Sequence, residues 1–290
     1  MDTIMEFESE AKVRVILPEI MFGVINSDAE FFASNKNRMC NQIFAYYSNL
    51  AEISKQEISL KPSRTLQFTL NQENIDRFAA VCDTLQIGNK AEYFRQVLYL
   101  YCNQPRYLRE RILFSKSVQV IEESIKARRK LRIRYKDEYR IVEPYFIIKS
   151  DGETRNYLFC YCEKRQEYCN YRLMNFHALA TMRQRMLEHY DSVSIEQIRQ
   201  NFDAFLSSGK QVKVRLSDEG VKFLKRNITH RPKLLEQAGD VYTFECSQLK
   251  AQLYFPQFMY HAEILEPASL RMWFKNNFAK VSELYQDITD

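Results

Sequence analysis

The chain has 290 residues, of which 46% are hydrophobic and 27% charged, and its formal net charge is +5. This composition is typical of a globular protein and excludes collagen-like, coiled-coil and intrinsically disordered chains. The length predicts about two domains, or three small ones. No apolar run approaches the ~18 residues that a membrane span needs, and the acidic start does not resemble a signal peptide. We therefore expect a cytoplasmic protein without a membrane partner.

The scarcity of glycine excludes several enzyme classes, and the pattern of cysteines bears on disulfides. Even the closest pair of glycines, Gly209 and Gly220, is too widely spaced for a dinucleotide fingerprint, a phosphate-binding loop or a nucleophile elbow. The seven cysteines are odd in number and scattered, which favours reduced thiols over a disulfide framework. We expect no cofactor.

Charge is distributed unevenly along the chain. Residues 1–60 contain five Lys/Arg and nine Asp/Glu, whereas residues 104–140 contain twelve and five. A concentrated basic segment favours an anionic partner at one surface. A solvated helix face would have the same composition, so this alternative stays open.

The first hundred residues contain a repeat. Residues 12–18 and 65–70 each alternate apolar and polar side chains, with Val13, Val15 and Leu17 matching Leu66, Phe68 and Leu70. This period predicts a strand with one buried face. An amphipathic helix follows each strand, and a polar break precedes a second helix at about 38–50 and 91–102.

Strand, helix and helix, occurring twice, resembles the ribbon-helix-helix fold over residues 11–103. In that family two copies pair their strands into an antiparallel ribbon, and here one chain carries both. The resemblance implies an outward face that could read the major groove of duplex DNA. Apart from Ile16, this face consists of Lys12, Arg14, Thr65, Gln67 and Thr69. The alternative is a scaffold or dimerisation module, because polar residues alternate on any half-exposed strand.

A helix over 117–130 is followed by strand-like stretches over 131–148 and 155–176. Val118, Ile121 and Ile125 share one helical face, and the later stretches alternate or are rich in β-branched and aromatic residues. One helix followed by several short strands predicts a small, curved β-barrel.

Residues 117–186 resemble a WYL domain, a bacterial regulatory module. The positions that match the family's order are Tyr135, Arg140, Pro144, Tyr157, Leu158, Arg165, Tyr171, Arg172 and Leu173. The family's Trp is replaced by Asn156, its loop His by Glu163, and an Asp by Met174. Two of its arginines are replaced by Cys169 and Asn175.

The resemblance implies binding of single-stranded nucleic acid or small nucleotide ligands, without catalysis. Basic side chains follow a phosphate backbone, and aromatic faces stack on bases. The predicted binding residues are Arg132, Arg134, Tyr135, Arg140, Tyr157, Tyr161, Arg165, Tyr171 and Arg172. The alternative for each aromatic is a role in filling the small barrel.

Residues 210–290 resemble the α/β extension that commonly follows WYL domains. The predicted fold class is α+β, with a tandem ribbon-helix-helix module over 1–104. The predicted chain continues with a linker helix and an SH3/Sm-like WYL barrel over 105–190. It ends with an α/β subdomain over 191–290.

Two kinds of reactive site receive little support. Cys160, Cys162, Cys169 and His177 could supply metal ligands, but their spacing is unusual for zinc, and we expect buried thiols and no metal. Arg172 and His177 resemble the Arg/His element of HEPN ribonucleases, which belongs on a helix, whereas these residues lie on predicted strands. We expect no catalytic residue.

The combination of modules resembles the WYL accessory proteins of type VI-D CRISPR systems. This implies a non-enzymatic protein that binds single-stranded RNA and enhances an RNA-guided RNA nuclease. The alternatives are a ligand-sensing transcription regulator that binds duplex DNA through its ribbon, and an RNA-cleaving enzyme that uses Arg172 and His177. A homodimer is expected, since symmetric pairs are the commonest oligomers.

Overall fold

The computed structural model describes residues 11–48, 61–135, 137–149, 155–186, 189, 191–200, 202–207 and 209–285. The chain forms two compact units. The first comprises Met1–Lys149, Thr154–Glu167 and Tyr171–Glu188, and the second comprises Ser150–Glu153, Tyr168–Asn170 and His189–Asp290.

The first two strands pair as the alternation predicts. β1 (Lys12–Pro18) and β2 (Pro62–Thr69) form an antiparallel ribbon in which Val13 lies opposite Phe68 and Val15 opposite Leu66. These apolar side chains are buried, and the polar side chains between them are exposed. The strand predictions are therefore confirmed.

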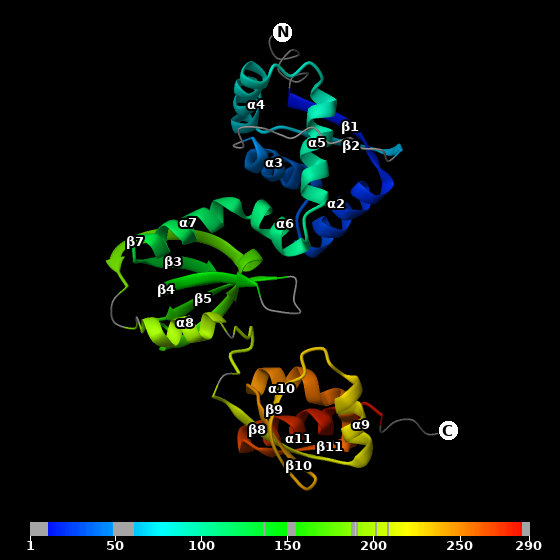
Figure 1. The fold of residues 1–290 in the computed structure, drawn as a ribbon, viewed down its shortest axis with the longest axis vertical. Helices are drawn as coiled ribbons and strands as arrows, with labels where there is room; N and C mark the ends of the chain where they lie inside the picture. Colours follow the sequence, from blue (N-terminus) through cyan, green and yellow to red (C-terminus); the bar gives the residue numbers. More distant parts are fainter. Residues whose placement is uncertain are drawn as a thin grey trace. The chain divides into compact units, whose positions relative to one another are not determined.

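Two helices follow each of these strands (Figure 1). They are α2 (Glu19–Phe31) and α3 (Lys36–Tyr47) after β1, and α4 (Gln72–Leu85) and α5 (Lys90–Cys102) after β2. The polar breaks are helix caps: the side chains of Asn35 and Asn89 accept from the N–H groups of Arg38 and Glu92. The second helices thus begin slightly earlier than predicted, and the predicted end at Leu50 falls outside the described residues. We call β1 to α5 the ribbon module.

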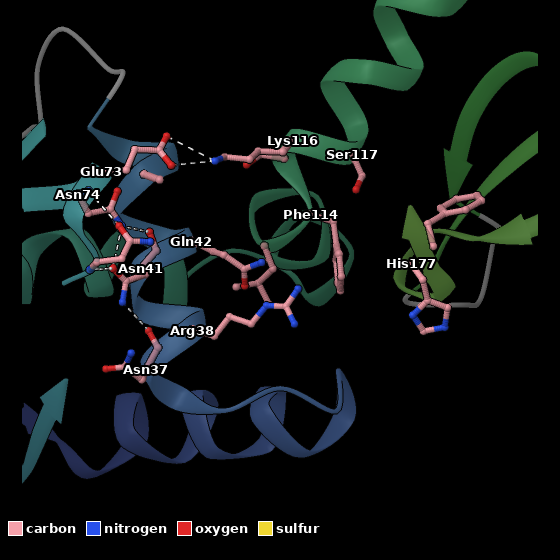
Figure 2. Close-up of a pocket in the computed structure, with 15 residues that line it drawn as sticks. Asn37, Arg38, Asn41, Gln42, Glu73, Asn74, Phe114, Lys116, Ser117 and His177 are labelled. Atoms are coloured by element: carbon pink, nitrogen blue, oxygen red, sulfur yellow. Dashed lines mark hydrogen bonds and ion pairs between the residues drawn. The ribbon is translucent and has the colours of Figure 1, made fainter. Parts of the chain in front are cut away.

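Asn41 anchors α3 to the chain that joins β2 to α4 (Figure 2). Its amide nitrogen donates to the carbonyls of Asn37 and Thr69, both at 2.9 Å. Its amide oxygen accepts from the Asn71 N–H and from Nδ2 of Asn74. Both donors and both acceptor positions are thereby occupied, so this junction is rigid.

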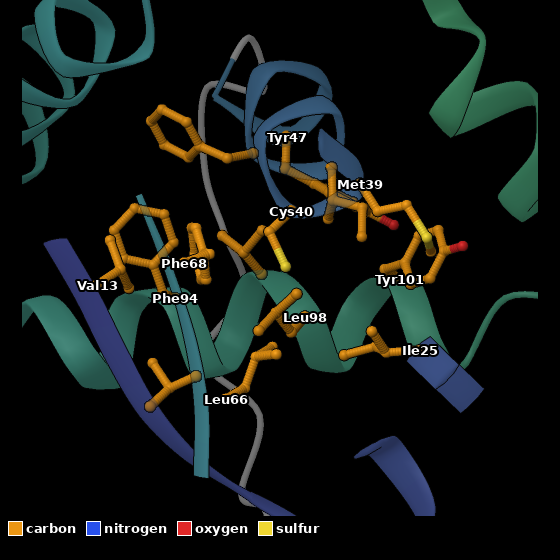
Figure 3. Close-up of a cluster of buried hydrophobic side chains, with 14 of the residues drawn as sticks. Val13, Ile25, Met39, Cys40, Tyr47, Leu66, Phe68, Phe94, Leu98 and Tyr101 are labelled. Carbon is orange, nitrogen blue, oxygen red and sulfur yellow. The ribbon is translucent and has the colours of Figure 1, made fainter. Parts of the chain in front are cut away.

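The core of the ribbon module lies between the ribbon and its helices. Figure 3 shows side chains of β1 and β2, such as Val13 and Phe68, facing Phe94 and Leu98 of α5 and Cys40 of α3, and all are buried. Burial raises the pKa of the Cys40 thiol to about 12. This thiol is therefore neutral at physiological pH and serves as an apolar packing group.

A buried ion pair joins α2 to α6 (Arg106–Leu113). Asp28 is fully buried and accepts from Arg109 Nε at 2.5 Å and Nη2 at 3.0 Å. The hydroxyl of Tyr101 in α5 also donates to Asp28, at 2.7 Å. Since an unpaired buried charge is costly, this network fixes α6 against the ribbon module.

A five-stranded sheet, which we call the central sheet, follows α7 (Ser115–Lys126). Its strands are β3 (Arg129–Tyr135), β4 (Glu138–Lys149), β5 (Asn156–Cys162), β6 (Glu167–Arg172) and β7 (Phe176–Arg185), with a 3-10 turn, η1 (Leu173–Asn175). The strand order is β6-β5-β4-β3-β7. Within the described residues β6 and β7 are the two edges, so the predicted closed barrel is not found.

The predicted helix over 117–130 differs from α7 at its C-terminal end. Arg128 adopts a left-handed backbone with φ of 50°, and β3 begins at the next residue. The basic residues 129 and 130 therefore belong to the sheet. A left-handed residue is a common way to end a helix.

The second unit has a four-stranded antiparallel sheet of order β11-β8-β10-β9. Its elements are α8 (Ser192–Gln200), β8 (Gln211–Leu216), α9 (Asp218–Arg226), β9 (Lys233–Ala238), β10 (Val241–Glu245), α10 (Gln248–Tyr254), η2 (Phe255–His261), β11 (Ala262–Glu266) and α11 (Ala268–Glu283). This unit therefore combines strands with helices. The helices within the described ranges include none that is long and apolar enough to cross a membrane.

Candidate nucleic-acid interface

The strand register separates the predicted arginines and tyrosines onto two faces of the central sheet. Ile133 lies opposite Arg140, whereas Arg134 lies opposite Tyr139. Directly opposite residues of an antiparallel pair share a face, and neighbours along a strand alternate. Arg132 and Arg134 therefore lie on one face, and Arg140 on the other.

Helix α7 covers the face that carries Ile133 and Arg140. Ser124 of α7 forms a hydrogen bond with Thr181 of β7 at 2.7 Å, and Thr181 lies opposite Leu131 in the sheet. Leu131 and Ile133 are fully buried. We call this the inner face and the opposite one the outer face.

The outer face exposes two arginines and a tyrosine. Arg132 and Arg134 are exposed, and the Arg132 guanidinium lies 5.6 Å from the centre of the Tyr139 ring. Tyr139 is 61% exposed. Along β7, the residues opposite the two arginines are Ala180 and Ala178, which are also exposed. Both guanidinium groups are thus open to solvent on the side of β7, and that of Arg134 also lies 3.6 Å from the carboxylate of Asp137.

Tyr139 was missed by the sequence reasoning. It does not match a WYL family position, but its alternation with Arg140 could have placed it on the face of Arg134. A cation beside an aromatic ring that is open to solvent can engage phosphate and base together. Among the described residues of this face, Tyr139 thus presents an exposed aromatic ring beside an arginine.

A third basic residue of the outer face is neutralised locally. Lys130 is buried, and its Nζ lies 2.7 Å from Oε1 of Glu163 and 3.5 Å from Oε1 of Glu143. The hydrogen bond to Glu163 raises the pKa of Lys130 above its ordinary value. Glu163 occupies the position at which the WYL family has a His. In this chain the residue at that position is therefore the ion-pair partner of Lys130.

On the inner face Arg140 and two tyrosines form one cluster. Arg140 donates to the Tyr171 hydroxyl at 2.8 Å and to Glu138 at 2.9 Å. The rings of Tyr171 and Tyr135 lie 4.6 Å apart, and Tyr135 also packs edge-on against Phe176. These groups are engaged with one another, and Tyr171 is only 3% exposed.

Arg172 lies near a buried carboxylate of α6. Glu110 is fully buried and accepts from the backbone N–H and the side-chain Nδ2 of Asn156, both at 2.8 Å. Its second oxygen has no hydrogen-bond partner in the described chain. Burial raises the pKa of Glu110, and the positive charge of Arg172 opposes that rise.

Burial, together with the like charge of Arg155, lowers the pKa of Arg172. Its guanidinium lies 5.2 Å from the Phe31 ring of α2. Asn156, at the position of the family's Trp, also donates to the Tyr107 carbonyl at 2.7 Å. The Asn in place of Trp therefore fastens α6 to the sheet.

The remaining predicted residues of the sheet are dispersed. Tyr161 is buried, Tyr157 is half-buried, and Arg165 is exposed with Glu167 at 3.6 Å. The ribbon residues are brought together: Lys12 lies opposite Thr69, and Arg14 opposite Gln67. With Ile16 and Thr65 they form a single exposed face.

The residues considered for metal binding or RNA cleavage show no converging site. Cys160, Cys162 and Cys169 are buried free thiols, and the described residues include no group of three or more His, Cys, Asp or Glu arranged to hold a metal. Arg172 ends β6, whereas His177 is exposed at the start of β7.

Comparison with known proteins supports the assignment of the central sheet. Residues 116–181 match the family model of the WYL domain. A solved structure described as "Crystal structure of a CRISPR Cas-related protein" is similar with a TM-score of 0.67 at 15% identity, over 96% of this chain and 95% of that chain. Proteasome accessory factor B/C (PafBC) of Arthrobacter aurescens matches with a TM-score of 0.32 at 17% identity, over 77% of this chain and 37% of that chain. No curated protein matches in sequence.

Proposed function

We propose that this protein, whose residues 116–181 form a WYL domain, is a regulatory protein that binds single-stranded RNA on the outer face of that domain. The observation that carries the proposal is the exposed group of Arg132, Arg134 and Tyr139. The arginines would contact phosphates, and the tyrosine ring would stack on a base.

The size of the effect follows from stacking and charge. Stacking of one base on an aromatic ring contributes ~1–3 kcal/mol, which is roughly 5- to 150-fold in affinity. Each phosphate contact adds ~0.7 to the slope of log affinity against log salt for a single strand. Tyr139 should therefore control affinity at any salt concentration, and Arg132 should control the salt dependence.

The test is a fluorescence-anisotropy titration of one labelled oligonucleotide as single-stranded RNA, single-stranded DNA and duplex DNA. Tyr139→Ala should weaken RNA binding at least about fivefold, and Arg132→Ala should lower the salt slope by ~0.7. Tyr285 is 66% exposed and Arg271 lies 2.7 Å from Glu263, both in the second unit. Tyr285→Ala and Arg271→Ala are thus matched controls and should bind normally.

Unchanged RNA affinity in Tyr139→Ala and Arg132→Ala would move the site away from the outer face. An equal loss of RNA affinity in the two control variants would show that the loss comes from overall charge or from reduced stability, and not from the outer face. Stronger binding to duplex DNA than to single-stranded RNA would favour the second function below.

We further propose that the protein enhances an RNA-guided RNA nuclease of a type VI-D CRISPR system. The similar solved structure is described as CRISPR Cas-related, which supports this choice of partner. Adding the protein to such a nuclease should increase cleavage of target RNA, and Tyr139→Ala should reduce the increase. Light scattering should report a homodimer, and RNA incubated with the protein alone should stay intact.

A second candidate function is duplex DNA binding through the ribbon. It is favoured by the exposed face on which Arg14 lies opposite Gln67, since such side chains can contact base edges. Arg14→Ala with Gln67→Ala should then weaken duplex DNA binding and leave RNA binding unchanged. If the pair instead weakens RNA binding alone, the ribbon belongs to the RNA surface.

A further inference from the structure

A cavity of about 490 Å³, open to solvent on one side, lies in the first unit, and the residues that line it are not those of the outer face. Its walls come from α3, the start of α4, the junction of α6 and α7, and the start of β7 (Figure 2). The ribbon module therefore provides one side and the WYL domain the other. A volume of this size is typical of sites for small organic molecules, which range over ~300–1,000 Å³.

The wall on the ribbon side is fixed before any ligand arrives. Asn41 and Asn74 line the cavity, and the bonds of Asn41 to Asn37, Thr69, Asn71 and Asn74 hold α3 to the start of α4. Because the donors and acceptors of Asn41 are already occupied, it shapes the wall without being free to bind a ligand.

Other polar groups in the walls remain available. Among the described residues, the side chains of Arg38, Gln42 and His177 have no hydrogen-bond or ion-pair partner. In Figure 2 Arg38 and Gln42 extend from α3 toward Phe114, and His177 lies beyond Phe114 on β7. These three groups approach one space from two different parts of the unit.

The charge of the walls favours an anion. Lys116 and Glu73 lie across from each other and form an ion pair at 3.1 Å, so their charges offset one another. Among the described residues of the lining Glu73 is the only acidic one, and the Arg38 guanidinium has no ion-pair partner among them. Arginine is suited to bind a phosphate or carboxylate through two parallel hydrogen bonds.

The cavity also offers an apolar surface for a planar group. Phe114 is half-buried, and Phe32 packs against its ring with centroids 6.0 Å apart. The rest of the ring lines the cavity beside Arg38 (Figure 2). Inorganic phosphate would leave most of this space empty and this ring uncovered.

We propose that this cavity binds a planar organic anion of nucleotide size, with its phosphate or carboxylate on Arg38 and its ring against Phe114. Gln42 and His177 would recognise polar groups at the ring edge. A ligand there would contact both the ribbon module and the WYL domain. This site does not depend on RNA binding at the outer face.

The test is isothermal titration calorimetry of the full chain with defined probes. They are the four nucleoside monophosphates, the corresponding nucleosides, an aromatic carboxylate (indole-3-carboxylate) and inorganic phosphate. At least one nucleotide or the aromatic carboxylate should bind, and the nucleosides and inorganic phosphate should bind at least tenfold more weakly. The preferred probe identifies the source of the anion. Weak binding of every probe, even at millimolar concentrations, would overturn the proposal.

Two variants locate the site. Arg38→Gln should weaken the preferred probe at least tenfold, and Gln42→Glu should do the same because its carboxylate places a negative charge beside Arg38. Arg64→Gln is the control, since Arg64 is an exposed arginine of the same module that bonds to Glu19. Thermal unfolding checks that each variant folds. Unchanged affinity in folded Arg38→Gln and Gln42→Glu, or equal loss in Arg64→Gln, would show that the cavity is not the site.

Discussion

Removal of the Asn156 side chain should destabilise the first unit strongly. The residue is 1% exposed, and its amide nitrogen donates to Glu110 at 2.8 Å and to the Tyr107 carbonyl at 2.7 Å. A hydrogen bond to a charged group contributes ~1.5–3 kcal/mol and a neutral one ~0.5–1.5 kcal/mol. Asn156→Ala should therefore lower the free energy of unfolding by about 2–4 kcal/mol where Glu110 is ionised.

The loss should depend on pH in a definite direction. Burial raises the pKa of Glu110, so the folded protein holds this proton more tightly than the unfolded chain does. Stability then falls as pH rises through the raised pKa, because the ionised carboxylate is buried. Asn156 stabilises that ionised form, so its loss should cost most at a pH above the raised pKa of Glu110 and less once Glu110 is protonated.

Urea unfolding followed by far-UV circular dichroism measures this effect at neutral and acidic pH. Trp273 is the only tryptophan and lies in α11 of the second unit, so its fluorescence midpoint should not move. Asn277→Ala is a control, because Asn277 makes one hydrogen bond, to a carbonyl of its own helix. A cost below about 1 kcal/mol, or a cost that grows at acidic pH, would refute the reasoning.

Three further predictions rest on buried groups. Glu110→Gln should remove the fall of stability with rising pH, measured as unfolding free energy against pH, and an unchanged slope would assign that fall to another group. Arg109→Ala should cost about 3–5 kcal/mol, because the buried Asp28 loses its closer guanidinium and keeps only the longer ion pair to Arg106, at 3.6 Å; a cost below about 1 kcal/mol in urea unfolding would contradict this. Gly220→Ala should destabilise the second unit by about 1–3 kcal/mol, since its Cβ would lie 2.4 Å from the carbonyl oxygen of His261, and tryptophan fluorescence would report an unshifted midpoint if the backbone could adjust freely.

Local pattern was sufficient for the ribbon module. Val13, Val15, Leu66 and Phe68 alternate with polar residues, and this alternation alone determines which face of each strand is buried. The caps at the second helices were visible as polar breaks. Each of these features depends on neighbours in sequence, which is why the sequence revealed them.

The candidate interface was only partly accessible from sequence. Arg132 and Arg134 are among the predicted binding residues and lie on one face of the sheet, but Tyr139 lies across a hairpin from them and matches no family position. The bond between Asn156 and Glu110 joins residues 46 positions apart. That bond depends on how α6 packs on the sheet. The spacing of apolar residues along the sequence does not indicate which helix packs against which strand.

The central sheet shows a similar limit. Its strands follow from β-branched and aromatic residues, whereas closure depends on whether β6 and β7 meet. The described residues of these strands form opposite edges. Closure is a property of tilt and stagger over all strands, so the short stretches of sequence could not decide it.

The two strands of the ribbon belong to one polypeptide and differ in sequence. Its formation therefore requires no second molecule, and the two strands should stay paired when the protein is diluted until light scattering reports a monomer. The exposed face also lacks strict twofold symmetry, since Arg14 on one strand faces Gln67 on the other. A ligand that contacts both strands would therefore bind in one orientation. In the reversed orientation, the part that had contacted Arg14 would meet Gln67 instead.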